Sequence, residues 1–218
     1  MSIIRLAWLS AMLPILGLAG CASTGSYDYS ALRASRPHSI VVLPPLNNSP
    51  EVEATYSMYA QMTHPLAEAG YYVLPVALVD ETFKQNGLTT AADIHAVSAQ
   101  KLHDIFGADT ALYVTVKDYG STYTIVNSVI TVTADAKLVD LKTGTQLWSG
   151  TASANSNENN NNSGGGWMGI LLTAVVRQVI NSTTDAAHPI AGLTSARLLA
   201  GGRRDGLLYG PRSREYEK

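Results

Sequence analysis

Hydrophobic and polar positions along the chain change period several times, and the first half predicts strands that alternate with helices. The apolar, β-branched run at 38–43 stops at Pro44-Pro45, which is typical of a central strand buried on both faces. From residue 51 to Gly70 the apolar positions recur with a helical period. One helical face would collect Val52, Tyr56, Tyr59, Met62 or Thr63, and Leu66 as core residues. A short strand at 71–74 follows.

Two more helices are predicted, at 76–86 and at 90–107, the second opened by Thr90 with Asp93 three residues later. From residue 109 the pattern alternates with period two, with a break at Gly120-Ser121, a long run at 122–141 and a last strand that reaches about residue 154. Residues 140–144 read as a hairpin loop in which Gly144 takes a positive φ. The predicted fold is a single α/β domain with a mixed sheet, a C-terminal antiparallel meander and helices packed on it.

The last third of the chain lacks this regularity. Residues 155–166 are nearly all Asn, Ser and Gly, which indicates a mobile loop. The apolar run Trp167–Val176 is too short to span a bilayer, so it is expected to close the core or to form a homodimer contact. A short helix is expected at 189–199, and residues 201–218 are expected to dock as an extended tail.

The first 21 residues have the layout of an export signal. Arg5 precedes an apolar stretch, and small residues lead to Cys21, the only cysteine. The run Leu18-Ala19-Gly20-Cys21 resembles the lipobox of bacterial lipoproteins. That resemblance implies cleavage before Cys21, lipidation of its thiol and acylation of the new amine. Because Ala22 replaces the aspartate that retains lipoproteins in the inner membrane, it further implies an outer-membrane anchor, with the domain in the periplasm or at the cell surface.

The predicted organisation is therefore a signal peptide at 1–20, a lipidated tether at 21–37, a globular domain at 38–200 and a tail at 201–218. Loss of Arg5 with the signal leaves 14 basic against 17 acidic residues, a net charge near −3. Without a basic stripe in the sequence, a nucleic-acid partner is not expected. Once Cys21 carries lipid, no cysteine remains for a disulfide, so stability must come from burial.

No catalytic or cofactor motif is present in the sequence. There is no Gly-x-Ser-x-Gly elbow, dinucleotide or phosphate loop, or His-Glu-x-x-His pair. The five histidines are scattered, and His95 and His103 on one helix would stand about 12 Å apart, too far to share a metal ion. The sequence therefore predicts a protein that is not an enzyme and has neither a metal nor a cofactor.

Two further stretches resemble known envelope proteins. Phe106-Gly107-Ala108-Asp109 with the strand at 112–116, and 140–150 with its Gly144 and Trp148, are similar to pieces of the TolB N-terminal domain and the curli secretion channel. With the lipobox, the Asn-rich loop and the Tyr-Gly-Pro-Arg tail, the chain resembles a family of bacterial outer-membrane lipoproteins of the neisserial surface-antigen type. The resemblance implies a TolB-like fold and a companion role beside curli-channel-like lipoproteins.

Three functions remain open at this point. The first is a non-catalytic transport, secretion or assembly lipoprotein that binds protein partners at the outer membrane. The second is a module that binds a periplasmic or cell-wall ligand. The third, a hydrolase, would need a polar groove that converges on the histidines, whereas an exposed sheet edge or apolar patch would favour the first.

Overall fold

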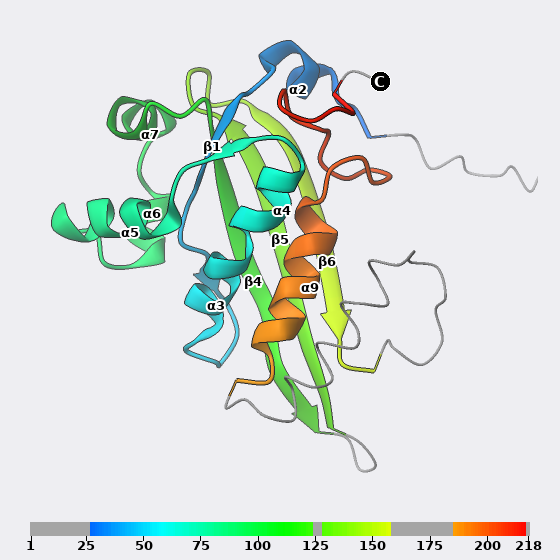
Figure 1. The fold of residues 1–218 in the computed structure, drawn as a ribbon. Helices are drawn as coiled ribbons and strands as arrows, with labels where there is room; N and C mark the ends of the chain where they lie inside the picture. The colour runs from blue at the N-terminus through cyan, green and yellow to red at the C-terminus, as the bar shows by residue number, and fades with distance from the viewer. Residues whose placement is uncertain (1–26, 124–127, 158–184, 217–218) are drawn as a thin grey trace, which may run out of the picture.

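The computed structural model describes residues 27–123, 128–157 and 185–216, which are built on a six-stranded mixed sheet (Figure 1). The sheet order is β3-β1-β4-β5-β6, and β2 also pairs with β4. β1 is parallel to β3 and β4, whereas β4, β5 and β6 form an antiparallel meander. The strands are β1 Ser39–Val42, β2 Leu46–Asn47, β3 Tyr72–Val73, β4 Thr110–Tyr123, β5 Ser128–Asp140 and β6 Gln146–Asn155. The predicted fold class is confirmed.

Helices cover the two faces of the sheet unequally (Figure 1). Helices α3 (Ala54–Gln61), α4 (Thr63–Glu68) and α9 (His188–Leu199) pack on one face and form the larger core. Helices α5 (Val76–Gln85), α6 (Ala91–His95) and α7 (Ala99–Phe106) form a second, smaller core on the other face. The remainder of that second face, over β4 to β6, carries polar pairs such as Lys117 with Asp135.

The strand predicted at 38–43 is the central parallel strand β1, and its burial on both faces is confirmed. Ile40 and Val42 join the larger core, and Val41 and Leu43 join the smaller one. Because successive side chains of a strand point to opposite faces, an uninterrupted apolar run is what a strand between two helical layers requires. β1 therefore connects the two cores.

The helix predicted at 51–70 is wrong in its continuity and partly wrong in its buried face. It divides at Met62 into α3 and α4. The core face follows an i, i+4 series through Ala54, Met58, Met62 and Leu66, with Tyr59 beside it. Two residues that were expected to be buried are exposed to solvent instead: Val52 is 84% exposed and Tyr56 is 51% exposed.

The helix predicted at 90–107 is also two helices. Thr90 caps α6 by accepting the amide of Asp93, as expected. Ser98 then starts α7 by accepting the amide of Lys101, because a serine hydroxyl at a helix start satisfies an otherwise unpaired N–H. The chain turns between the helices, so His95 and His103 do not share one helix.

The predicted break at Gly120-Ser121 is wrong, because β4 continues to Tyr123. Gly120 has φ +111°, and a Cβ there would lie 3.0 Å from the Glu51 side chain, so this glycine lets the Glu51 side chain approach the strand closely.

The hairpin at 140–144 is confirmed. Gly144 has φ +72° and donates its amide to the carbonyl of Asp140.

Part of the predicted tether belongs to the packed structure. Helix α2 (Ser30–Ser35) buries Leu32, and Tyr27 accepts a hydrogen bond from the Ser149 amide of β6. The described part of the expected tail, residues 201–216, docks without helix or strand, and the helix expected at 189–199 is α9. The signal, Cys21, most of the Asn-rich loop and Trp167–Val176 lie outside the described residues.

Candidate functional site

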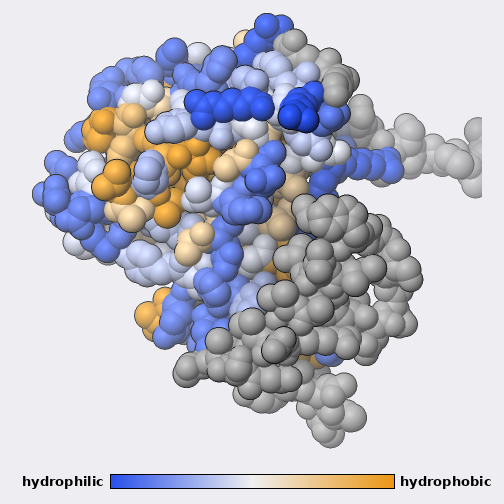
Figure 2. Space-filling view, in the orientation of Figure 1, coloured by the Kyte–Doolittle hydropathy of each residue, from blue (hydrophilic) through white to orange (hydrophobic). Residues whose placement is uncertain are grey.

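The smaller core is incompletely covered between α5 and α7. Leu74, Val97 and Phe106 are only partly buried where they pack on this core. Leu78 on α5 and Ile105 on α7 are 66% and 44% exposed. Figure 2 shows apolar side chains gathered on the side of the molecule where α5 and α7 lie. We call this surface, defined by Leu74, Leu78, Val97, Ile105 and Phe106, the open flank.

The open flank follows from the construction of the smaller core. α5 buries Val79 and Phe83, and the Phe83 ring meets the Phe106 ring edge-on at 5.2 Å. The short helices α6 and α7 add Ile94 and Leu102 beneath them. Apolar side chains at the margin of this layer stay accessible, and exposed apolar side chains that gather on one side of a protein are typical of interaction sites.

The outer edge of β6, by contrast, has main-chain groups that are hydrogen-bonded to side chains. The Ser149 amide donates to the Tyr27 hydroxyl at 2.9 Å, and the Arg197 guanidinium donates to the Ser153 carbonyl at 2.8 Å. Both main-chain groups point away from β5, so they are the groups that an added strand would pair with. Covering them with side chains protects a sheet edge from pairing with another chain.

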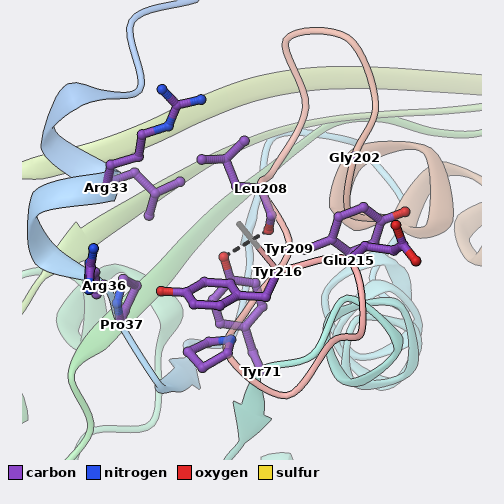
Figure 3. A pocket seen from close by; sticks show the side chains of 11 residues that line it. Arg33, Arg36, Pro37, Tyr71, Gly202, Leu208, Tyr209, Glu215 and Tyr216 are labelled. Carbon is purple, nitrogen blue, oxygen red and sulfur yellow. Dashed lines mark hydrogen bonds between the residues drawn. The ribbon is translucent and has the colours of Figure 1, made fainter. Parts of the chain in front are cut away.

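A half-open cavity of about 510 Å³ lies between α2 and the C-terminal tail (Figure 3). Residues of α2 and residues of the tail face each other across it. The Tyr71 hydroxyl donates to the Leu208 carbonyl at 2.9 Å, which holds the tail at the base of the cavity. Charged and aromatic side chains contribute to the lining: Arg33, Arg36, Tyr71, Tyr209, Glu215 and Tyr216. Its volume suits a small ligand.

A chain of hydrogen bonds links α3, β4 and the N-terminal end of α9. Ser57 Oγ lies 2.7 Å from His188 Nδ1 and 2.7 Å from the Tyr119 hydroxyl. The Tyr119 hydroxyl also lies 2.8 Å from Asp185 Oδ2, and Gln61 Nε2 lies 2.7 Å from His188 Nε2. Ser57 and Tyr119 are buried, so the contacts that these two side chains make satisfy polar groups away from water.

The direction of each hydrogen bond in this network follows from the number of protons that each group can donate. An ionised Asp185 only accepts, so Tyr119 gives its single proton to Asp185, and burial raises the pKa of Tyr119 and keeps that proton in place. Ser57 must then donate to Tyr119 and accept from His188 Nδ1–H, while His188 Nε2 accepts from Gln61. With these directions the network joins α3, β4 and the N-terminal end of α9.

The other histidines do not converge with His188. His95 Nε2 lies 2.9 Å from the Pro44 carbonyl, and burial lowers the pKa of His95. His103 Nδ1 lies 2.9 Å from the Ala108 carbonyl, and His64 is exposed. Within the described residues, no group of three or more His, Cys, Asp or Glu side chains is placed to hold a metal ion.

Sequence reasoning missed the network, the cavity and the open flank. Ser57 and His188 are 131 residues apart, and no local pattern pairs them. The cavity likewise joins α2 to a tail about 175 residues later. Only the open flank has a local signal in the sequence, because Leu78 and Ile105 lie on the polar sides of their helices. The periodicity alone did not indicate that these two side chains are exposed.

Comparison with known proteins places the chain in a family. The family model described as "GNA1162-like: Putative lipoprotein GNA1162-like" matches residues 27–212. A Neisseria meningitidis serogroup B protein, "Putative lipoprotein NMB1124/NMB1162", is 50% identical over 200 residues, 91% of this chain and 92% of the relative. The crystal structure of lipoprotein GNA1162 from N. meningitidis is 57% identical with a TM-score of 0.55, and the match covers 67% of this chain and 100% of the solved chain.

The matched range 27–212 includes α2 and the docked Tyr-Gly-Pro-Arg segment, in agreement with their packing on the domain. No helix in the described part of the chain has the length and apolar character of a membrane span. Because the family model spans most of the chain and the neisserial relative matches nearly its whole length, this protein belongs to the GNA1162-like lipoprotein family.

Proposed function

We propose that this protein is a non-catalytic outer-membrane lipoprotein, anchored through Cys21, that serves a transport, secretion or assembly system by binding a protein partner. The observation that carries the proposal is the open flank between α5 and α7, where Leu78 and Ile105 are exposed beside an apolar core. Membership of a lipoprotein family supports the anchor.

A protein partner fits the open flank better than a small ligand does. The flank is formed by side chains of α5, α7 and the adjoining loops, and none of them lines the cavity between α2 and the tail. Aromatic and aliphatic side chains at the centre of such a patch are the usual anchors of protein interfaces. By its resemblance to companion proteins, a curli-channel-like lipoprotein is the first partner to test.

The decisive experiment places a photo-crosslinking amino acid at Leu78 or at Ile105 in the native bacterium. We expect a discrete crosslinked product, and we expect Leu78→Asp with Ile105→Asp to abolish co-purification of the same partner. Val52→Asp is the matched control, because Val52 is 84% exposed and lies outside the flank. A partner that survives the flank variants but is lost with the control would refute the proposed surface.

The cavity between α2 and the tail supports a second function, the binding of a small ligand. Its volume of about 510 Å³ and its arginine and tyrosine lining are properties of a ligand site. This function is compatible with the first, because the cavity and the open flank share none of their residues.

A further inference from the structure

The arginines of this chain are concentrated at one end of the fold. Residues 27–37 and 201–216 contain six arginines against three acidic residues, a charge of +3. The whole chain carries −2, so the remaining residues carry −5. All six arginines are exposed: Arg33, Arg36, Arg203, Arg204, Arg212 and Arg214. The molecule therefore has a basic end, although its net charge is negative.

The two segments form one surface. The Tyr29 hydroxyl donates to the Gly206 carbonyl at 2.6 Å, and the Tyr27 amide donates to Asp205 Oδ1 at 3.2 Å. Figure 1 shows α2 and the tail together at the same end of the sheet. The cavity opens between them, with Arg33 and Arg36 on the α2 side. We call this surface the basic end.

The basic end is also the end nearest the anchor in the chain. Five residues separate Cys21 from Tyr27, and the six residue-to-residue steps span at most about 22 Å when the chain is extended. If Cys21 is lipidated, α2 cannot leave the vicinity of the lipid surface. Arginines held there experience the potential of anionic head groups, and the guanidinium fork matches phosphate oxygens in geometry.

We propose that the basic end binds the phosphate-bearing head groups of anionic lipids in the membrane that holds the anchor, and that the cavity between α2 and the tail receives one head group. The proposal rests on the anchored state of the proposed function and does not depend on the open flank. Arg33 and Arg36 pair with the phosphate, while the tyrosine rings enclose the glycerol part. The contact would fix the domain on the membrane with α5 and α7 free for a partner.

The test uses the full acylated protein purified in detergent. Native mass spectrometry counts the lipids that it retains from mixed micelles containing phosphatidylglycerol or phosphatidylcholine. We expect selective retention of phosphatidylglycerol, reduced at least fivefold in Arg33→Gln/Arg36→Gln. Lys84→Gln/Lys101→Gln removes the same charge from α5 and α7 and should retain the lipid as the wild type does. Equal retention by both double variants would overturn the proposal.

Two further arms separate the alternatives. Glycerol 3-phosphate is titrated as a soluble competitor. If it binds as tightly as the lipid and depends equally on Arg33 and Arg36, the site binds a soluble phosphate compound. That result would reject the proposed membrane contact. Thermal unfolding of each variant identifies any loss of fold, and in that case Arg33→Lys/Arg36→Lys replaces the glutamine pair. Because these substitutions leave Leu78 and Ile105 unchanged, partner crosslinking reports separately on the open flank.

Discussion

The main chains of Gly70 and Gly210 lie so close together that neither position has room for a side chain. A Cβ at Gly210 would lie 2.7 Å from the Gly70 carbonyl oxygen, and a Cβ at Gly70 would lie 2.8 Å from the Gly210 oxygen and 2.5 Å from the Ser213 amide nitrogen. The Gly210 amide donates to the Ala69 carbonyl at 2.7 Å. This contact attaches the C-terminal tail to the chain just after α4, next to Tyr71 and Pro211 of the cavity lining.

The first prediction concerns this contact. Gly70→Ala should destabilise the fold by about 2–4 kcal/mol, because a positive φ and main-chain crowding both oppose a methyl group. Gly87→Ala is the control, since Gly87 also has a positive φ but nothing lies within 4 Å of its Cβ position. Urea denaturation should therefore show the smaller loss for Gly87→Ala. Equal losses would mean that crowding contributes nothing and that the tail is not held at Gly70.

The second prediction concerns the buried network. Tyr119→Phe removes the hydroxyl that connects Ser57 to Asp185, and we expect a loss of about 1–3 kcal/mol because buried Ser57 and half-buried Asp185 each lose a hydrogen bond. Tyr113→Phe is a suitable comparison, because the Tyr113 hydroxyl makes no hydrogen bond with the described residues. Denaturation midpoints measure both. If the two variants lose the same stability, the network does not join α3 to α9.

The third prediction is a pH dependence at Asp109. Burial acts to raise the pKa of this carboxyl, but donors from His38 and Ser39 outweigh burial, so the pKa lies below 3.8. A depressed folded-state pKa gives stability that is present above pH 3.8 and is lost as the pH falls through the folded value. Asp109→Asn should cost about 1 kcal/mol at pH 7, and this difference should shrink below pH 3.8.

Asp118→Asn is the charge-matched control for Asp109, because Asp118 is exposed on β4 and accepts no hydrogen bond from the described residues. At pH 7 this variant should lose less unfolding free energy than Asp109→Asn does. A gap between Asp109→Asn and wild type that widens on acidification would contradict the assigned sign.

The fourth prediction concerns the anchor. Cys21→Ala should abolish incorporation of labelled palmitate and release the protein from the membrane fraction, because the only thiol of the chain is lost. Ser23→Ala keeps the thiol and should label normally. Membrane sedimentation and palmitate labelling of the alanine variant at wild-type levels would exclude Cys21 as the lipidated residue.

The fifth prediction concerns oligomerisation through Trp167–Val176. If this segment forms a homodimer contact, light scattering on the unlipidated protein should give a mass that rises with concentration, and Leu171→Glu should leave a folded monomer. An unfolded Leu171→Glu variant would assign the segment to the core. A monodisperse wild-type monomer at high concentration would reject the dimer.

Local sequence patterns determined most of the individual elements. The apolar run at 38–43 specifies a strand buried on both faces, and the alternation after residue 109 specifies the meander. Thr90 and Gly144 mark a helix start and a turn, because each acts through groups within a few residues of itself. These features need no knowledge of distant residues, so the sequence alone was sufficient.

The tertiary structure decided which faces are covered and which residues meet. Periodicity placed Val52 and Tyr56 in a core face, but the core uses Ala54 and Met58 instead, because the position of α3 on the sheet is set by α9 more than 120 residues later. The pairing of Ser57 with His188 depends on the same contact. The basic end likewise arises only when the tail packs against α2. Such contacts have no local signature, since the side chains that make them are chosen by the packing of separate segments and not by their neighbours in sequence.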